Sequence, residues 1–265
     1  MTRIKKTFSL LESTNSKAFI GYIVAGDPNK EMTIEAMHLM SNNGVDIIEL
    51  GVPFSDPMAE GPSIQRGHER ALHNKTSMED IFGIVKEYRR EDDKTPIVLM
   101  GYYNNFNAIG GETFFTKALN SGIDGVLIVD MPLEESKSFS SMAMNYKVDV
   151  IRLISPTTSL ERSEKILREA SGYIYFVSLN GVTGSDKINI SRIERQIKNL
   201  QTLTDLPVVI GFGIKDKKTA QDAAILASGV VVGSVLVDIM AISKDEIKES
   251  LTHKLKELSS ALVQN

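Results

Sequence analysis

Residues 46–65 read DIIELGVPFSDPMAEGPSIQ, an apolar run that ends in Glu49 and Leu50 and passes into a loop of glycine, proline and serine. The run is short and bounded by turn formers, as in a buried strand of a parallel sheet. An unpaired carboxylate is costly to bury, so an acid at the end of such a strand indicates either chemistry or a structural partner. The loop beyond it carries two more acids, Asp56 and Glu60. The stretch predicts a strand that leads into an acidic loop.

Seven further apolar runs alternate with segments of helical period along the chain. Residues Ile81, Ile84 and Val85, for example, share one face of a helix. Eight strands, each followed by a helix, are typical of a (β/α)8 TIM barrel of the α/β class, with an open doubly wound sheet as the alternative. We expect a single domain over residues 1–265, with an extra N-terminal helix. The predicted strands are residues 18–24, 46–50, 96–100, 125–129, 148–154, 173–178, 207–211 and 229–233.

Composition argues against several classes of protein. The formal net charge is −4 with scattered lysines and arginines, so no basic surface for nucleic acid or an anionic membrane is predicted. No run of about 18 apolar residues and no signal-like segment occurs, so we expect a cytoplasmic protein. The absence of cysteine excludes disulfides and thiolate nucleophiles. The four histidines are dispersed without an HExxH motif, so no metal site is predicted.

The ends of the strands are where a barrel of this kind carries its active site. No lysine stands at a predicted strand end, which disfavours a Schiff-base aldolase. The last two strands finish in IGFGI (210–214) and VVGSVL (231–236), where glycines let backbone N–H groups approach an anion and a short helix can begin. A phosphate site is predicted at these two ends.

A long polar loop follows the sixth strand, SLNGVTGSDKINIS at residues 178–191. Long loops inside compact domains are usually functional or disordered. A lid that closes over a phosphorylated substrate and an ordinary mobile surface loop both remain open.

Several motifs together resemble one known family. The stretches are ELGVPFSDPMAEGPSIQ (49–65), FIGYIVAGDPN (19–29), DGVLIVDMPLEES (124–136), SPTTS (155–159), YIYFVSLNGVTG (173–184), IGFGI (210–214) and VVVGS (230–234). They are similar to the tryptophan synthase α-subunit family. The resemblance implies a TIM-barrel lyase that cleaves indole-3-glycerol phosphate to indole and glyceraldehyde 3-phosphate in L-tryptophan biosynthesis. It also implies a β-subunit partner in an αββα heterotetramer, with pyridoxal phosphate only in that partner and no cofactor in this subunit.

Retro-aldol cleavage at an indole C3 requires that a proton reach C3, that the indole N–H be held, and that the carbinol hydroxyl lose its proton. Two carboxylates can do this without a metal or a cofactor, if each lies within hydrogen-bond reach of its own atom. Desolvation should raise the pKa of Glu49, which suits a proton shuttle. A buried acid paired with backbone N–H or a tyrosine is the alternative for Glu49.

The second acid departs from the family, which has aspartate where this chain has Glu60. The extra methylene moves the carboxylate by more than an ångström if the loop is unmoved, and such a misplacement can cost on the order of 100-fold in rate. We assign Glu60 as the acceptor of the indole N–H, with a solvated loop acid as the alternative.

The resemblance assigns the other site residues position by position. Tyr175, near the carbinol, and Thr183, in the lid, complete the catalytic set. The phosphate binders it implies are Gly184, Gly213, Gly233 and Ser234. The indole pocket it implies is lined by Tyr22, Ile64, Met100, Leu127 and Phe212. Two of these, Tyr22 and Met100, stand where phenylalanine and leucine are commoner.

Two other functions remain open. Another phosphosugar barrel, such as an isomerase or a metal-dependent aldolase, would need a metal cluster or a catalytic histidine or lysine at the strand ends, where none stands. A weakly catalytic barrel, limited by Glu60, would act mainly by binding and activating the β chain. In either case two of the prolines of PFSDPMAEGP, together with Phe54, are expected to be exposed as a contact surface.

Overall fold

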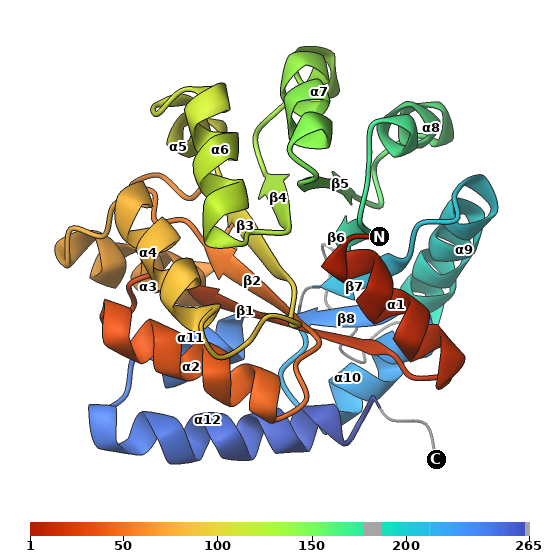
Figure 1. Cartoon of the computed structure of the whole chain (residues 1–265). Helices are drawn as coiled ribbons and strands as arrows, with labels where there is room; N and C mark the ends of the chain where they lie inside the picture. The colour runs from red at the N-terminus through yellow and green to blue at the C-terminus, as the bar shows by residue number, and fades with distance from the viewer. Residues whose placement is uncertain (178–186, 212, 263–265) are drawn as a thin grey trace.

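Eight parallel strands close into a barrel in which each strand pairs with its neighbours in sequence and β8 pairs back with β1 (Figure 1). The computed structural model describes residues 1–177, 187–211 and 213–262, with the backbone alone for residues 187–192. The predicted TIM barrel is confirmed, and the open sheet is excluded. The strands are β1 Ala18–Val24, β2 Ile47–Gly51, β3 Ile97–Gly101, β4 Gly125–Ile128, β5 Asp149–Ile154, β6 Ile174–Val177, β7 Val208–Gly211 and β8 Gly229–Val232.

The observed strands begin and end within one residue of the predicted ranges. The agreement follows from composition, since runs of valine, isoleucine and leucine stop at glycine, proline or polar residues that terminate strands. The predicted polar loop at 178–191 is shorter than expected, because helix α9 begins at Lys187. Residues 178–186 of that loop lie outside the described residues.

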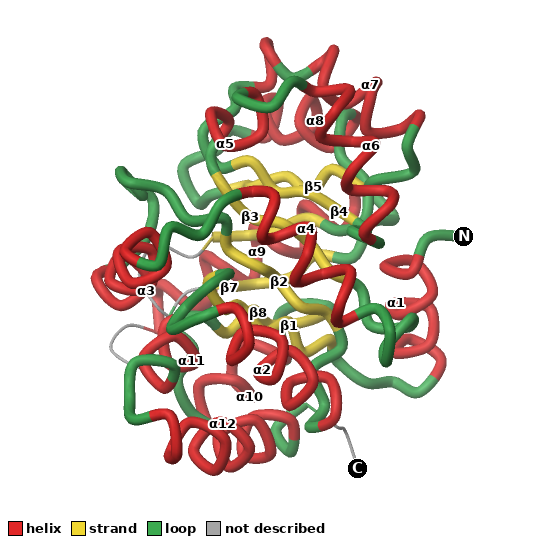
Figure 2. The backbone as a smooth tube through the Cα atoms, turned by 60° about the vertical axis from the view of Figure 1, so that its left-hand side comes forward, coloured by secondary structure: helices red, strands yellow, loops and turns green. Residues whose placement is uncertain are grey.

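Helices form a layer around the barrel, and Figure 2 shows them in red outside the yellow strands. A typical helix start is that of α4, where Ser77 and Asp80 form a capping box. The helices are α1 Arg3–Ser13, α2 Lys30–Asn42, α3 Pro62–His73, α4 Met78–Tyr88, α5 Tyr103–Asn107, α6 Gly111–Ser121, the 3-10 turn η1 Leu133–Glu135, α7 Lys137–Asn145, α8 Leu160–Arg168, α9 Lys187–Leu203, α10 Lys217–Ala224, α11 Ser234–Ile239 and α12 Lys244–Ser259.

The barrel interior is built by every second residue of the strands, because successive side chains of a strand point to opposite faces. One buried cluster fills the interior and includes Ile20, Ile47, Val98, Leu127, Ile151, Tyr173, Val209 and Val231. Two positions further along each strand, on the same face, are Tyr22, Glu49, Met100, Val129, Leu153, Tyr175, Gly211 and Gly233. This next inward layer, toward the carboxyl ends of the strands, therefore contains five of the predicted site residues: Tyr22, Glu49, Met100, Tyr175 and Gly233.

The extra N-terminal helix is present as α1, which packs against the opposite end of the barrel interior. Its buried residues Ile4 and Phe8, one helical turn apart, join the interior cluster, and the Phe8 ring lies 5.9 Å from the Tyr173 ring. Figure 2 shows α1 at one end of the strands and α3 at the other. With the α1 end filled by apolar side chains, the functional end is the one beside α3.

Candidate active site

Glu49 is a fully buried carboxylate on β2, facing the barrel interior. The Tyr173 hydroxyl donates a hydrogen bond of 2.5 Å to Glu49 Oε1, while Glu49 Oε2 has no hydrogen-bond partner among the described residues. Burial raises the pKa of the Glu49 carboxyl to about 7, against a smaller lowering by the Tyr173 hydroxyl. A carboxyl with this pKa exchanges its proton readily near neutral pH. One oxygen is therefore anchored, and the other is left for a reacting group.

Glu60 is the second buried carboxylate, with only 9% of its surface exposed. The Tyr102 hydroxyl, at the end of β3, donates to Glu60 Oε2 and accepts from the Ala59 backbone N–H at 3.1 Å. Burial raises the pKa of Glu60, and the hydrogen bond from Tyr102 partly offsets this. The alternative of a solvated loop acid is wrong, because the side chain turns inward and bonds a buried tyrosine.

Two tyrosines lie within the electrostatic reach of both carboxylates. Burial is the main cause that raises the pKa of Tyr22, followed by the charges of Glu60 and Glu49. The pKa of Tyr175 is likewise raised by burial first and then by Glu49 and Glu60. Tyr22 is the register partner of Glu49 on the neighbouring strand, and Tyr175 lies in the same inward layer, so the geometry agrees with these couplings.

Glycines on the neighbouring strands make room for these tyrosines. A Cβ atom at Gly51 would lie 2.2 Å from Tyr22 Oη, and one at Gly211 would lie 2.1 Å from Tyr175 Oη. Real Cβ atoms do not approach other atoms so closely, so a side chain at either glycine would displace a hydroxyl from the site. The two glycines therefore leave the space that the hydroxyls of Tyr22 and Tyr175 occupy.

Four of the five residues predicted to line the indole pocket are described, and they lie in adjoining apolar clusters. Ile64 and Met100 are half-buried and pack against a small cluster that contains Tyr22. Leu127 is completely buried in the interior cluster, where Met100 and Tyr175 also pack, so it lies one layer below the other described residues of the predicted indole pocket. Phe212 lies outside the described residues.

The predicted phosphate end has three described residues. Gly213 has φ +76°, a conformation that favours glycine, and Gly233 is the N-cap of α11, with exposed Ser234 as the first helical residue. N–H groups in the first turn of a helix lack partners inside the helix. A Cβ atom at Gly233 would lie 3.4 Å from both Ile64 Cδ1 and Tyr22 Cδ1, so this end adjoins the pocket. The fourth predicted phosphate binder, Gly184, and the predicted catalytic residue of the lid, Thr183, lie outside the described residues.

The loop between β2 and α3, residues 52–61, is held from several sides. The Phe54 backbone N–H donates to His68 Nδ1 at 3.0 Å, and Asn105 Nδ2 donates to the Pro53 carbonyl at 3.1 Å. The expected exposure is found only in part, because Phe54 is half-buried and its ring stacks on Tyr102 at 4.8 Å. Of the three prolines, Pro53 is buried, Pro57 is half-buried and Pro62 is exposed. The exposed surface of the loop instead contains Met58, which is 78% exposed.

Three site residues were not assigned from the sequence: Tyr173, Tyr102 and His68. Tyr173 stands two residues before Tyr175, so the two share the inward face of one strand, and this spacing could have identified it. His68 follows Ile64 by four residues, which places both on one face of α3. For Tyr102, the only sequence feature that pointed to the site was its position directly after the third strand.

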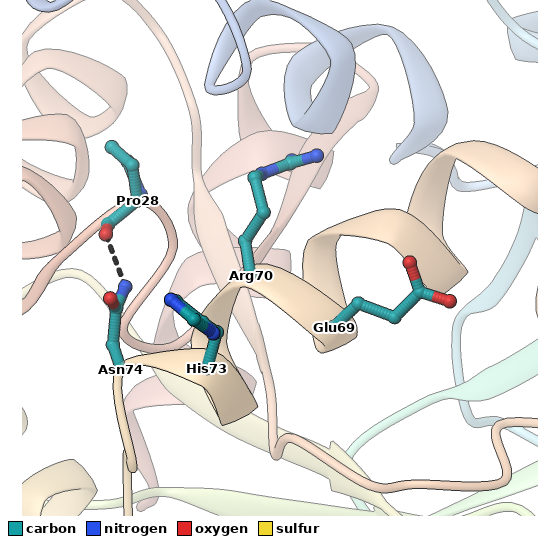
Figure 3. A pocket seen from close by; sticks show the side chains of 5 residues that line it. All are labelled: Pro28, Glu69, Arg70, His73 and Asn74. Carbon is teal, nitrogen blue, oxygen red and sulfur yellow. Dashed lines mark hydrogen bonds between the residues drawn. The ribbon is translucent and has the colours of Figure 1, made fainter.

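A separate hollow of about 420 Å³ lies beside α3 and contains none of the predicted site residues. Figure 3 shows its lining residues Pro28, Glu69, Arg70, His73 and Asn74. Over the part of the chain that the structure describes, no group of three or more potential metal-ligating side chains occurs. No helix among the described residues has the length and apolar character needed to cross a membrane.

Comparisons with known proteins agree with one another. The family model described as tryptophan synthase alpha chain matches residues 8–264. A protein of that name from Marinobacter nauticus is 44% identical over 265 residues, covering 99% of this chain and 98% of the relative. The crystal structure of tryptophan synthase subunit alpha from Legionella pneumophila has a TM-score of 0.91 at 37% identity, covering 98% of each chain.

One further structural neighbour concerns an assembly. It comes from work on the mutual activation of the tryptophan synthase a2b2 complex of Pyrococcus furiosus. Its TM-score is 0.84 at 37% identity, covering 92% of this chain and 99% of that chain.

Proposed function

Because the chain belongs to the tryptophan synthase alpha chain family, we infer that it is the lyase that cleaves indole-3-glycerol phosphate to indole and glyceraldehyde 3-phosphate in L-tryptophan biosynthesis. The observation that carries the inference is Glu49, a fully buried carboxyl with one oxygen bound by Tyr173 and the other without a partner. A group built in this way can pass a proton between two atoms of a bound substrate.

The first step needs an acid and an acceptor. Protonated Glu49 gives its proton to C3 of the indole ring, while ionised Glu60 accepts a hydrogen bond from the indole N–H and stabilises the positive charge that develops on the ring. Tyr102 holds the Glu60 carboxylate, which limits its orientations. A pKa of about 7 leaves a large fraction of Glu49 protonated at neutral pH.

The second step breaks the carbon–carbon bond. Glu49, now ionised, removes the proton of the carbinol hydroxyl, the C–O bond becomes the aldehyde, and the electrons of the breaking bond return to the indole ring. Glu49 ends protonated, as it began, so the two acids suffice and no electrons enter or leave. The charges of Glu49 and Glu60 both contribute to the raised pKa of Tyr175, which supports the place near the carbinol that the family resemblance implies for it.

The family and the structural neighbour from an a2b2 complex imply a β-subunit partner. We propose that this chain joins that partner in an αββα heterotetramer in the cytoplasm, with the exposed part of the loop around Met58 in the interface. In this proposal pyridoxal phosphate belongs to the partner alone, and this subunit works without a cofactor.

Indole release from indole-3-glycerol phosphate tests the function directly, measured with and without a cognate β subunit. We expect cleavage by the isolated chain and faster cleavage in the complex. Cleavage below detection in both samples would contradict the inference. Activation of the β subunit without any cleavage would instead support the alternative of a binding and activating barrel.

The phosphate site can be tested at Ser234, which is exposed at the start of α11. Ser234→Asp should weaken the binding of glycerol 3-phosphate on the order of 100-fold, because like charges a few ångströms apart repel strongly when only partly screened. Calorimetric titration of the isolated chain measures the change, with Ser234→Asn as the neutral control. Equal affinities for the two variants would place the phosphate elsewhere.

A further inference from the structure

His68 is a buried histidine on α3 that neither the family resemblance nor the reaction steps assign a role. Only 1% of its surface is exposed, and both ring nitrogens have partners. Nδ1 accepts the backbone N–H of Phe54 at 3.0 Å, and Nε2 lies 3.2 Å from Tyr22 Oη. It therefore joins the start of the loop at residues 52–61 to β1.

The hydrogen-bond donors fix the protonation state of this ring. A backbone N–H can only donate, so Nδ1 carries no proton, and the hydrogen of the neutral ring resides on Nε2. Nε2–H then donates to Tyr22 Oη. Burial lowers the pKa of His68 to about 4, which agrees with a neutral imidazole at physiological pH. The neutral His68 ring is thus held by one hydrogen bond at each nitrogen, from Phe54 N–H and to Tyr22 Oη.

From Phe54 the contacts continue to the second catalytic acid. The Phe54 ring stacks on the Tyr102 ring with centroids 4.8 Å apart and planes 19° from parallel. The Tyr102 hydroxyl in turn donates to Glu60 and accepts the Ala59 N–H at 3.1 Å. A shift of the Phe54 backbone would therefore turn the Tyr102 ring and move the carboxylate that it holds.

We propose that His68 is a positioning residue that sets the place of the Glu60 carboxylate through Phe54 and Tyr102. Glu60 has a longer side chain than the aspartate of the family, and an acid displaced by about 1 Å can lose on the order of 100-fold in rate. The hydrogen bond from Phe54 N–H to His68 holds the loop at residues 52–61 in the position in which the Glu60 carboxylate reaches the Tyr102 hydroxyl. The proposal rests on the role assigned to Glu60 in the proposed function.

Two substitutions separate the two ends of the imidazole. In His68→Asn the amide oxygen occupies the place of Nδ1, so the bond from Phe54 N–H is kept and the contact with Tyr22 is lost. In His68→Gln the amide group reaches the place of Nε2, so the contact with Tyr22 is kept and Phe54 N–H loses its acceptor.

The experiment measures kcat for indole release by the full-length chain, with glycerol 3-phosphate affinity as the check on the rest of the site. His68→Gln should lower kcat about 10- to 100-fold, while His68→Asn should stay within about threefold of the parent. In a Glu60→Ala background, His68→Gln should have no further effect on kcat, because the group that it positions is gone. Glycerol 3-phosphate affinity should be unchanged throughout.

Equal losses of kcat in His68→Asn and His68→Gln would overturn the proposal, as would a loss that persists in the Glu60→Ala background. If His68→Gln does not fold, Phe54→Leu replaces it, because this change keeps the backbone N–H bond and removes the ring that stacks on Tyr102. The same Glu60-dependent loss is then expected. Failure of the proposed function itself would be distinct, since the parent chain would release no indole.

Discussion

Glu49→Gln should lower kcat for indole release by on the order of 1,000-fold or more. Positioned acids and bases contribute about 100- to 10,000-fold each, and Glu49 acts in both capacities within one turnover. The amide has nearly the same shape and its oxygen can still accept the Tyr173 hydroxyl, so the buried site keeps its packing. What the variant loses is the exchangeable proton at Oε2. Steady-state indole release measures the effect.

The control for Glu49→Gln is the binding of glycerol 3-phosphate, which depends on residues that the substitution does not touch. Unchanged affinity together with lost cleavage would show that the proton transfer, and not the fold, is affected. Indole release within about tenfold of the parent would remove Glu49 from the proton path, since the smallest usual contribution of such a group is about 100-fold.

Glu60→Ala should lower kcat at least about 100-fold, and Glu60→Asp should lower it about 10- to 100-fold. The first change removes the acceptor of the indole N–H. The second shortens the side chain in a loop whose contacts are set for glutamate, because Tyr102 reaches the longer carboxylate from the end of β3. The aspartate would lose either Tyr102 or the indole nitrogen.

Tyr102→Phe is the matched test of that explanation, because it removes the hydroxyl and keeps the ring that Phe54 stacks on. If Tyr102 holds Glu60, then Glu60→Asp should cost less in the Tyr102→Phe background than in the parent. A rise in kcat on Glu60→Asp would mean that the native acid is misplaced. Parent-like kcat/KM in Glu60→Ala would show that the reaction does not use this carboxylate.

The fold could be predicted because its signals are local and repeated. The apolar run at 46–50 and its seven counterparts predicted every strand within one residue, since each ends at a turn former. The inward position of Glu49 follows from the same spacing of two residues that buries Ile47. The burial of Glu49, and the direction in which its pKa moves, could therefore be stated before the structure was known.

The partners of the acids could not be predicted, because they come from segments far apart in the sequence. Tyr102 lies 42 residues from Glu60, and Tyr173 lies 124 residues from Glu49. Only the closure of the barrel brings these hydroxyls to the carboxylates. The half-burial of Phe54 was also not predicted, since its stacking on Tyr102 depends on that closure.

The most direct test of the central claim, that Glu49 begins the reaction protonated, is the pH dependence of kcat/KM for indole release by the isolated chain. With a Glu49 pKa of about 7, kcat/KM should fall as pH rises through that value, because the free enzyme loses the proton that C3 must receive. Tyr173→Phe should move this fall to higher pH, since it removes the hydroxyl that stabilises the ionised carboxylate. A flat profile from pH 6 to about 9, or a fall that Tyr173→Phe leaves in place, would contradict the account.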